Sequence, residues 1–389
     1  MEEWKKVKLG DCIKEIVERT TINNQYKVLS VTKDGIYSQE EIFKKQIASK
    51  NNVGYKVIRR NNLVFSTMNL WMGSLDVLTN YDIGIVSPAY KIFEFNEELI
   101  LPEYGIYYMK SHYMLEKYKD CSEQGASVVR RNLNLKDLLD VEVKIPSIVE
   151  QKKIVDILKN VDLIIEKIEK EIQIIEAQKD RYLNLLLNKE NNKNVEWIEL
   201  KDICEIITKG RTAKKFTNKG IKFVKLESLE RGFIFNDKCS YISEDEHTSF
   251  LKKSILKEKD ILFAIAGTIG KCAVVKKENL PANTNQALAI IRLKDTNNTE
   301  YISKILESAL MKKYIRMNFT EGAQPNLNLD QIGKFKIPIV ESKVKTNILN
   351  VVNMYETKIM LSKDRKNEYQ LLRKGLIQRL LNGKIRVKI

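Results

Sequence analysis

The sequence predicts an α+β fold: two similar α+β domains separated by two long antiparallel coiled-coil helices, with an internal pseudo-twofold repeat. Two observations lead to this prediction. Short landmarks recur in the same order in both halves of the 389-residue chain, and two stretches of about 40 residues carry a helical pattern of apolar residues. The chain also exceeds the roughly 250–300 residues at which single hydrophobic cores stop growing, so more than one domain is expected.

Composition places the chain among folded, basic proteins. Apolar residues make up 43% of it, and the formal net charge of +16 favours a polyanionic partner such as nucleic acid. No stretch approaches the ~20 apolar residues of a membrane span, and the N-terminus lacks the apolar core of a secretory signal, so a cytoplasmic protein is expected. The five cysteines are scattered without a C-x-x-C pair, which favours reduced, buried thiols over disulfides or zinc.

The internal repeat rests on five landmarks whose members lie 191 to 198 positions apart. They are Trp4 with Leu9-Gly10-Asp11 and Trp197 with Leu200-Lys201-Asp202; 62–65 and 260–263; 87–89 and 285–287; Gly-Ala followed by Asn-Leu-Asn-Leu at 132–135 and 326–329; and Ile-Pro at 145–146 and 337–338. The stretches between landmarks differ strongly, as 66–86 and 264–284 show. A shared scaffold with different loops favours one kind of task performed on two different targets, with simple duplication followed by neutral drift as the alternative.

Each copy begins with a compact α+β domain, the first over 1–146 and the second over 191–338. Short β-rich runs at 26–31, 141–145 and 287–293 are separated by glycine and asparagine turns. Helical patches are expected at 103–118 and 299–317. The asparagines at 132, 134, 326 and 328 are expected to cap the next element, and the leucines between them to pack.

A long helix follows each domain, over 147–190 in the first copy and 339–389 in the second, the latter with a C-terminal tail. No glycine or proline interrupts 148–188. The expected apolar seams are Ile154, Leu158, Val161, Ile165, Ile168, Ile172, Ile175, Tyr182 and Leu186 in the first helix, and Ile348, Val352, Tyr355, Ile359, Tyr369, Leu372, Leu376 and Leu380 in the second.

Each helix would be about 60 Å long at 1.5 Å per residue, and a bare apolar stripe needs a partner. We expect the two helices to pair in antiparallel orientation and to act as a spacer.

The sequence lacks the motifs of common enzymes. Residues 267–272 echo a phosphate loop, but Ile265 and Cys272 stand where a true one has glycine and serine or threonine. The glycine turn of dinucleotide or S-adenosylmethionine sites, the Pro-Pro-aromatic string of amino-methyltransferases and the Gly-x-Ser-x-Gly elbow are also missing. The chain therefore reads as a binding protein rather than a catalyst.

Several of these segments resemble the specificity (S) subunits of type I restriction–modification systems. Residues 146–154, with Pro146 and Glu150-Gln151 before Ile154, are similar to the start of that family's first long helix, and Gly-Ala followed by Asn-Leu-Asn-Leu is typical of it. Residues 68–73 followed by 84–90 are similar to one class of its target-recognition domains. The second copy departs from the pattern at Glu341-Ser342, where glutamine is expected, and this puts in doubt a local contact of the second helix.

The resemblance implies a non-catalytic subunit that reads double-stranded DNA. Each target-recognition domain would read one half of a split site, and the helix pair would fix the gap. Two methyltransferase subunits would dock on the helices, and a restriction (motor-nuclease) subunit would join for cleavage. S-adenosylmethionine, ATP and Mg²⁺ would belong to those partners, with no cofactor in this chain.

Candidate DNA contacts are basic and polar residues of the expected loops, because cations bind phosphates and Arg, Asn, Gln and Ser read base edges. Each could equally be solvated surface charge, and Trp71 could be core. In the first domain they are Arg59, Arg60, Asn69, Trp71, Arg130 and Arg131, and in the second Lys209, Arg211, Lys214, Lys215, Thr268, Lys271 and Gln324.

Three alternatives stay open from the sequence. The chain could be a non-catalytic coiled-coil scaffold whose charge is incidental, an enzyme with an unrecognised site, or the specificity subunit of a modification-only or other phage-defence system.

Overall fold

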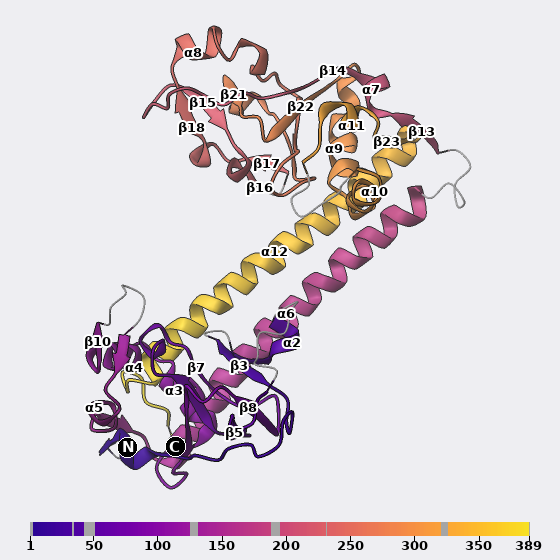
Figure 1. The fold of residues 1–389 in the computed structure, drawn as a ribbon. Helices are drawn as coiled ribbons and strands as arrows, with labels where there is room; N and C mark the ends of the chain where they lie inside the picture. Colours follow the sequence, from indigo (N-terminus) through magenta and orange to yellow (C-terminus); the bar gives the residue numbers. More distant parts are fainter. Residues whose placement is uncertain are drawn as a thin grey trace. The chain divides into compact units, whose positions relative to one another are not determined.

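The computed structural model describes residues 3–32, 35–42, 51–124, 131–187, 195–230, 232–319 and 326–388. The chain divides into two compact units: Met1–Glu169 with Asp364–Ile389, and Lys170–Lys363. Each unit holds one globular domain and one half of each long helix (Figure 1).

The first unit is built on a four-stranded antiparallel sheet in the order β2-β9-β6-β7. Smaller pairs join β1 to β12, β3 to β4, β5 to β8 and β10 to β11. The strands are β1 Lys5–Lys8, β2 Ile13–Glu15, β3 Leu29–Thr32, β4 Gly35–Ser38, β5 Lys56–Arg59, β6 Leu63–Ser66, β7 Leu75–Val77, β8 Ile83–Val86, β9 Tyr90–Phe95, β10 Ser122–Gln124, β11 Arg131–Leu133 and β12 Glu142–Ile145.

The second unit repeats this plan with a four-stranded sheet in the order β14-β22-β19-β20 and a β13–β23 pair. A three-stranded sheet, β18-β15-β21, replaces the smaller pairs, and β16 pairs with β17. The strands are β13 Glu196–Glu199, β14 Cys204–Lys209, β15 Ile221–Val224, β16 Leu229–Glu230, β17 Phe233–Ile234, β18 Ser240–Ile242, β19 Ile261–Ala264, β20 Cys272–Val274, β21 Ala282–Thr284, β22 Leu288–Leu293 and β23 Lys336–Ile339.

Short helices connect the strands in both units, and some of them occupy matching places in the two copies. In the first they are α1 Leu9–Cys12, α2 Gln39–Ile42, η1 Leu70–Met72, α3 Pro102–Met109, α4 His112–Asp120 and α5 Leu135–Leu139. In the second they are α7 Leu200–Ile203, η2 Leu226–Ser228, η3 Asn236–Lys238, α8 Glu244–Thr248, η4 Lys252–Ser254, η5 Lys277–Asn279, η6 Thr296–Asn298, α9 Thr299–Glu307, α10 Ala309–Phe319 and α11 Leu329–Gly333. The predicted α+β repeat is confirmed.

Each expected helical patch consists of two helices rather than one, and a serine marks the break in both. The Oγ of Ser111 accepts a hydrogen bond from the backbone N–H of Met114 at 3.3 Å, and that of Ser308 accepts one from Met311 at 3.2 Å. A serine that caps a new helix ends the preceding one, because its side chain replaces the missing backbone acceptor.

The Asn-Leu-Asn-Leu strings lead into the short helices α5 and α11, and the capping role predicted for their asparagines is confirmed at the second asparagine of each string. The side chain of Asn134 accepts hydrogen bonds from Lys136 N and Asp137 N, and that of Asn328 accepts one from Gln331 N at 2.8 Å. Leu327 is buried in the core of the second unit. The first asparagine of each string, Asn132 and Asn326, is exposed, so only the second caps a helix.

The two long helices are α6, Ile148–Leu187, and α12, Ser342–Leu380, and they pack against each other (Figure 1). In the first unit Lys366 pairs with Glu169 at 2.7 Å, and in the second Lys363 pairs with Glu176 at 3.1 Å. The residue number on one helix falls as that on the other rises, so the expected antiparallel pairing is confirmed.

Hydrophobic cores join the domains to these helices within each unit. Ile154, Val155 and Leu158 of α6 pack with the sheet and α3 in the first unit. Ile348 and Val352 of α12 pack with the sheet and α9 in the second unit.

The five cysteines are free and buried, as predicted. None of the helices in the described part of the chain is both long and apolar enough to cross a bilayer.

Candidate nucleic-acid interface

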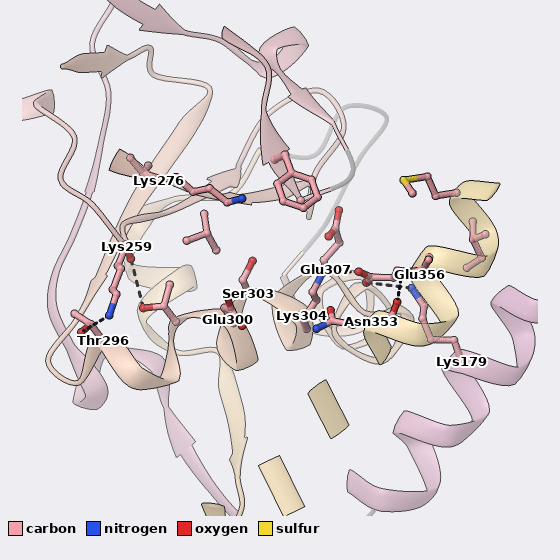
Figure 2. Close-up of a pocket in the computed structure, with 18 of the residues that line it drawn as sticks. Lys179, Lys259, Lys276, Thr296, Glu300, Ser303, Lys304, Glu307, Asn353 and Glu356 are labelled. Carbon is pink, nitrogen blue, oxygen red and sulfur yellow. Dashed lines mark hydrogen bonds and ion pairs between the residues drawn. The ribbon is translucent and has the colours of Figure 1, made fainter. Parts of the chain in front are cut away.

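A cleft of about 950 Å³ opens in the second unit between β20, α9 and α12 (Figure 2). Six lysines and five glutamates line it. Lys304 donates a hydrogen bond to Glu356, Lys179 lies 3.9 Å from the same carboxylate, and Lys363 pairs with Glu176. The lining therefore neutralises most of its own charge, and a phosphate group would gain little there.

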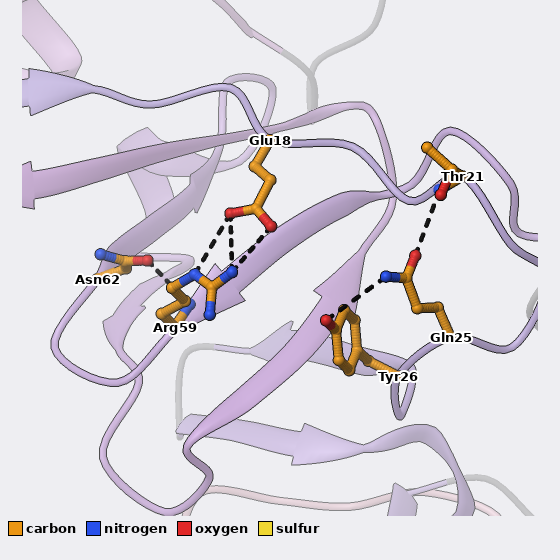
Figure 3. A network of polar contacts seen from close by, with 6 residues as sticks. All are labelled: Glu18, Thr21, Gln25, Tyr26, Arg59 and Asn62. Atoms are coloured by element: carbon orange, nitrogen blue, oxygen red, sulfur yellow. Dashed lines mark hydrogen bonds and ion pairs between the residues drawn. The ribbon is translucent and has the colours of Figure 1, made fainter.

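The first-domain arginines at 59 and 60 are already engaged with carboxylates. Arg59, the last residue of β5, makes a bidentate contact with Glu18 at 2.9 Å and 3.1 Å (Figure 3). This contact raises the pKa of the Arg59 guanidinium above its ordinary value. Arg60 pairs with Asp82 at 2.7 Å. A phosphate would have to displace both carboxylates.

Three of the other candidates of the first domain come together around η1. Trp71 lies within η1, Asn69 is its N-cap, and the guanidinium of Arg131 stacks 4.8 Å from the centre of the Trp71 ring. The Nε1–H of Trp71 is buried and has no hydrogen-bond acceptor among the described residues. This group is a compact polar and aromatic patch contributed by η1 and β11. Arg130, the neighbour of Arg131, lies outside the described residues, as does Gln324 of the second domain.

The second-domain candidates gather on the connection between β14 and β15, residues 210–220. Lys209 ends β14, and Lys214 and Lys215 are exposed. The cations of Arg211 and Lys214 lie 4.0 Å and 4.3 Å from the centre of the Phe250 ring. A cation over an aromatic face keeps its N–H donors available for another acceptor.

Backbone contacts hold this connection in place. Gly210 passes so close to β21 that an added Cβ would lie 2.1 Å from Thr284 O, so only glycine fits there. Arg211 N donates to Thr284 O at 3.0 Å, and Thr217 N donates to Tyr241 O at 2.9 Å. The connection is therefore ordered by its backbone, and its cationic side chains extend from a fixed base.

Thr268 and Lys271 occupy the turn between β19 and β20. Gly267 and Gly270 adopt left-handed backbone conformations, with φ of 70° and 84°, and these form the turn. Thr268 is exposed, whereas Lys271 is half-buried and its Nζ donates to Leu226 O at 3.4 Å. The turn thus presents Thr268 to solvent and directs Lys271 back towards η2.

Sequence reasoning did not single out the aromatic residues beside these cations. Phe216 is 45% exposed, stands edge-on to Phe223, and carries the ammonium of Lys225 at 4.3 Å from its ring centre. Phe250 carries Arg211 and Lys214. The available signal was the run 206–226, which has seven cations and no acidic residue around Phe216.

The described residues contain no cluster of three or more histidine, cysteine, aspartate or glutamate side chains that could hold a metal ion. The interface is built from cations, aromatic rings and neutral polar groups. Such a surface can bind a polyanion but has no constellation for bond chemistry.

Comparison with known proteins identifies the family. The type I restriction modification DNA specificity domain matches residues 1–177 and again 192–370, which together span most of the chain. The chain belongs to this family. It is a specificity subunit of a type I restriction–modification system, and that subunit is non-catalytic.

Similar proteins support the family assignment. The type I restriction enzyme MjaVIII specificity subunit of Methanocaldococcus jannaschii is 24% identical over 100% of this chain and 94% of its own. Two solved structures share the fold of the specificity subunit. One concerns complex assembly and conformational transition of the type I R-M system, with a TM-score of 0.56, 16% identity and 99% of both chains covered. The other is the S subunit from M. genitalium, with a TM-score of 0.51, 13% identity, and 99% and 96% covered.

Proposed function

We propose that each target-recognition domain of this specificity subunit reads one half of a bipartite double-stranded DNA site. The functional segments are 1–146 and 191–338 for the two readers, and 147–190 and 339–389 for the two helical parts. The length of the helix pair sets the number of unread base pairs between the half-sites. The subunit works in the cytoplasm, beside the chromosome that it marks.

The observation that carries this proposal is a duplicated scaffold with different surfaces. The sheet orders β2-β9-β6-β7 and β14-β22-β19-β20 correspond strand for strand. The elements around them differ: η1 with Trp71 and Arg131 belongs to the first domain, and the cationic connection 210–220 to the second. One scaffold with two different binding faces suits the reading of two different short sequences.

The helices also support a role in assembly. Besides the residues that pack between them, they expose large apolar side chains: Leu163 and Leu371 in the first unit, and Ile174 and Leu185 in the second. Contiguous apolar patches mark protein-interaction sites, and these four side chains are the candidates for such patches on the helix faces. We assign these faces to methyltransferase subunits, one for each half of the pair, with the restriction subunit joining that complex.

The chemistry of the complex then belongs to its other subunits. S-adenosylmethionine is the methyl donor of the methyltransferase subunits, and ATP with Mg²⁺ serves the restriction subunit. This chain contributes the choice of the DNA sequence.

Methylome sequencing of the host tests the proposal. In cells that carry the chain and its methyltransferase, we expect a bipartite motif with methylated adenines. Deletion of the chain should abolish methylation at that motif, and a plasmid copy should restore it. A methylation pattern that does not change on deletion would refute the proposed function, and a continuous motif without a gap would refute the two-reader assignment.

A further inference from the structure

The two domains differ sharply in charge at equivalent connections. The segment between β2 and β3, residues 16–28, contains Arg19, Lys27 and one acidic residue, Glu18, for a net charge of +1. The segment between β14 and β15, residues 210–220, contains Arg211, three lysines and no acidic residue, for a net charge of +4. Both segments leave the equivalent edge strand of the four-stranded sheet.

Three cations of this part of the second domain, at positions 211, 214 and 225, are not held by ion pairs within the described part of the chain. Among the described residues, no carboxylate pairs with the side chains of Arg211, Lys214 or Lys225, which instead lie over aromatic rings. The nearby carboxylate of Glu246 accepts a hydrogen bond from the backbone N–H of Lys214 and does not pair with the ammonium group of Lys214. These donors are therefore available to a phosphate.

Most charged and amide groups of the first domain's connection are engaged within the domain, whereas the ammonium of Lys27 lies 5.8 Å from the centre of the Tyr81 ring. The carboxylate of Glu18 accepts hydrogen bonds from Arg59, and Arg19 donates a hydrogen bond to Gly54 O at 2.9 Å. The amides of Asn24 and Asn52 bond each other at 2.7 Å, and Gln25 joins Thr21 to Tyr26 along the same segment (Figure 3). Neutral side chains and Arg19 therefore shape this connection.

We propose that the two domains bind DNA phosphates unequally. The principal phosphate clamp is the connection 210–220 together with Lys225 of the second domain. The rings of Phe216 and Phe250 position the cations of this clamp. The first domain contributes little to phosphate binding through its own connection. This inference rests on the proposed DNA-reading function and adds a division of labour to it.

The physical consequence is an asymmetric dependence on salt. Each phosphate neutralised by a cation releases counterions, and the slope of log K against log salt concentration changes by about 0.9 per contact on duplex DNA. Removal of clamp cations should flatten this slope. Removal of first-domain arginines that already bind carboxylates should leave it nearly unchanged.

The experiment measures binding by fluorescence anisotropy between about 50 and 200 mM salt, with the full chain assembled with its methyltransferase subunits on a duplex that carries the methylated motif. The clamp variant is Arg211→Gln with Lys214→Gln. The matched control is Arg59→Gln with Arg60→Gln, which removes the same charge from the first domain. We expect the clamp variant to flatten the slope by about one to two units and the control by less than about half a unit.

A third variant tests whether the Phe250 ring positions the clamp cations. Phe250→Leu keeps both cations but removes the ring face, so we expect an affinity loss of about two- to five-fold with an unchanged slope. Thermal unfolding of each variant separates these effects from loss of the fold.

The outcomes distinguish a failure of the asymmetric phosphate clamp from a failure of the proposed DNA-reading function. If the wild-type complex does not prefer the motif over a scrambled duplex, the proposed function fails. If the preference is present but both double variants flatten the slope equally, or only the control does, the asymmetric clamp is refuted and the function stands.

Discussion

At the scale of single residues, Glu150 holds both ends of the chain in the first unit. Its carboxylate is 1% exposed and pairs with Arg386 through two contacts of 2.8 Å. Trp4 Nε1 donates to the same group at 3.2 Å, and Arg386 lies 5.6 Å from the Trp4 ring centre. These contacts, above all the hydrogen bonds from Arg386, lower the pKa of Glu150.

Glu150→Gln should therefore destabilise the protein by about 2 kcal/mol at pH 7, because Arg386 loses the partner of a largely buried ion pair. A carboxyl whose pKa is lowered by folding stabilises above its ordinary pKa of about 4.3, and this stabilisation is lost as the pH falls through the lower folded value. Urea unfolding at pH 7 and pH 3.5 should show a difference between wild type and variant that shrinks in acid. Asp140→Asn is the control, since its Lys8 pair is exposed, and it should change little. An equal Glu150→Gln effect at both pH values would contradict this assignment.

Single residues also show where sequence reasoning succeeds. The repeated asparagines were predicted as caps because capping needs only the next three residues, and Asn134 and Asn328 do this. The departure at Ser342 is likewise local. Gln151 donates hydrogen bonds to Leu99 O and Pro146 O and accepts one from Leu101 N, and no such contact of the Ser342 side chain is found among the described residues. The pairing of Arg59 with Glu18 was not predictable, since it joins residues 41 positions apart across a fold.

At the scale of elements, the heptad pattern predicted most of the helix seam. Ile154, Leu158, Val161, Ile168, Ile172 and Ile175 are all buried. Beyond Lys179, the predicted seam residues Tyr182 and Leu186 are half-buried, whereas Leu183 and Leu187 are buried. Leu183 and Leu187 pack into the core of the second domain, a contact that the heptad pattern did not predict. Leu372 of α12, which was predicted to lie in the seam, is 48% exposed. The apolar pattern of a helix shows which residues share a face but not which neighbouring element covers that face.

Equivalent ties anchor each domain to the helix pair. In the first unit Asp162 of α6 accepts hydrogen bonds from Tyr107 of α3, at 2.8 Å, and from Arg373 of α12. In the second unit Glu356 of α12 accepts one from Lys304 of α9 and lies 3.9 Å from Lys179 of α6. The roles of the two long helices are exchanged between the units, as a pseudo-twofold repeat requires.

Asp162→Asn and Glu356→Gln should each weaken the tie in their own unit, by about 1 kcal/mol, since the groups are partly solvated. Hydrogen exchange should speed up in α3 for the first variant and in α9 for the second. The control is Glu176→Gln, whose pair with Lys363 is half-exposed and reaches no domain helix. Faster exchange in both units from either single variant would show that these ties do not act separately.

At the scale of the whole molecule, the sequence revealed the duplication because its landmarks fall on core strands and caps. The runs at 62–65 and 260–263 became β6 and β19, which lie at the same place in the two sheets. The strand order and the cation–ring contacts could not be predicted, since they depend on pairings between distant segments. The DNA-contact residues chosen from the sequence remain predictions, and the ion pairs of Arg59 and Arg60 favour the second-domain set over that pair.

The long helices give the last prediction, because their length is the property that the proposed spacing depends on. Insertion of four residues after Glu169 in α6 and after Lys363 in α12 adds one turn to both, about 6 Å at 1.5 Å per residue. With 3.4 Å per base pair along the duplex, the unread gap of the methylated motif should grow by one or two base pairs, with both half-site sequences unchanged. Insertion into α6 alone is the control. It puts the ion pairs Lys366–Glu169 and Lys363–Glu176 out of register with each other, so methylation should be lost rather than moved. Methylome sequencing reads both results, and a gap of unchanged length in the double insertion would show that helix length does not set it.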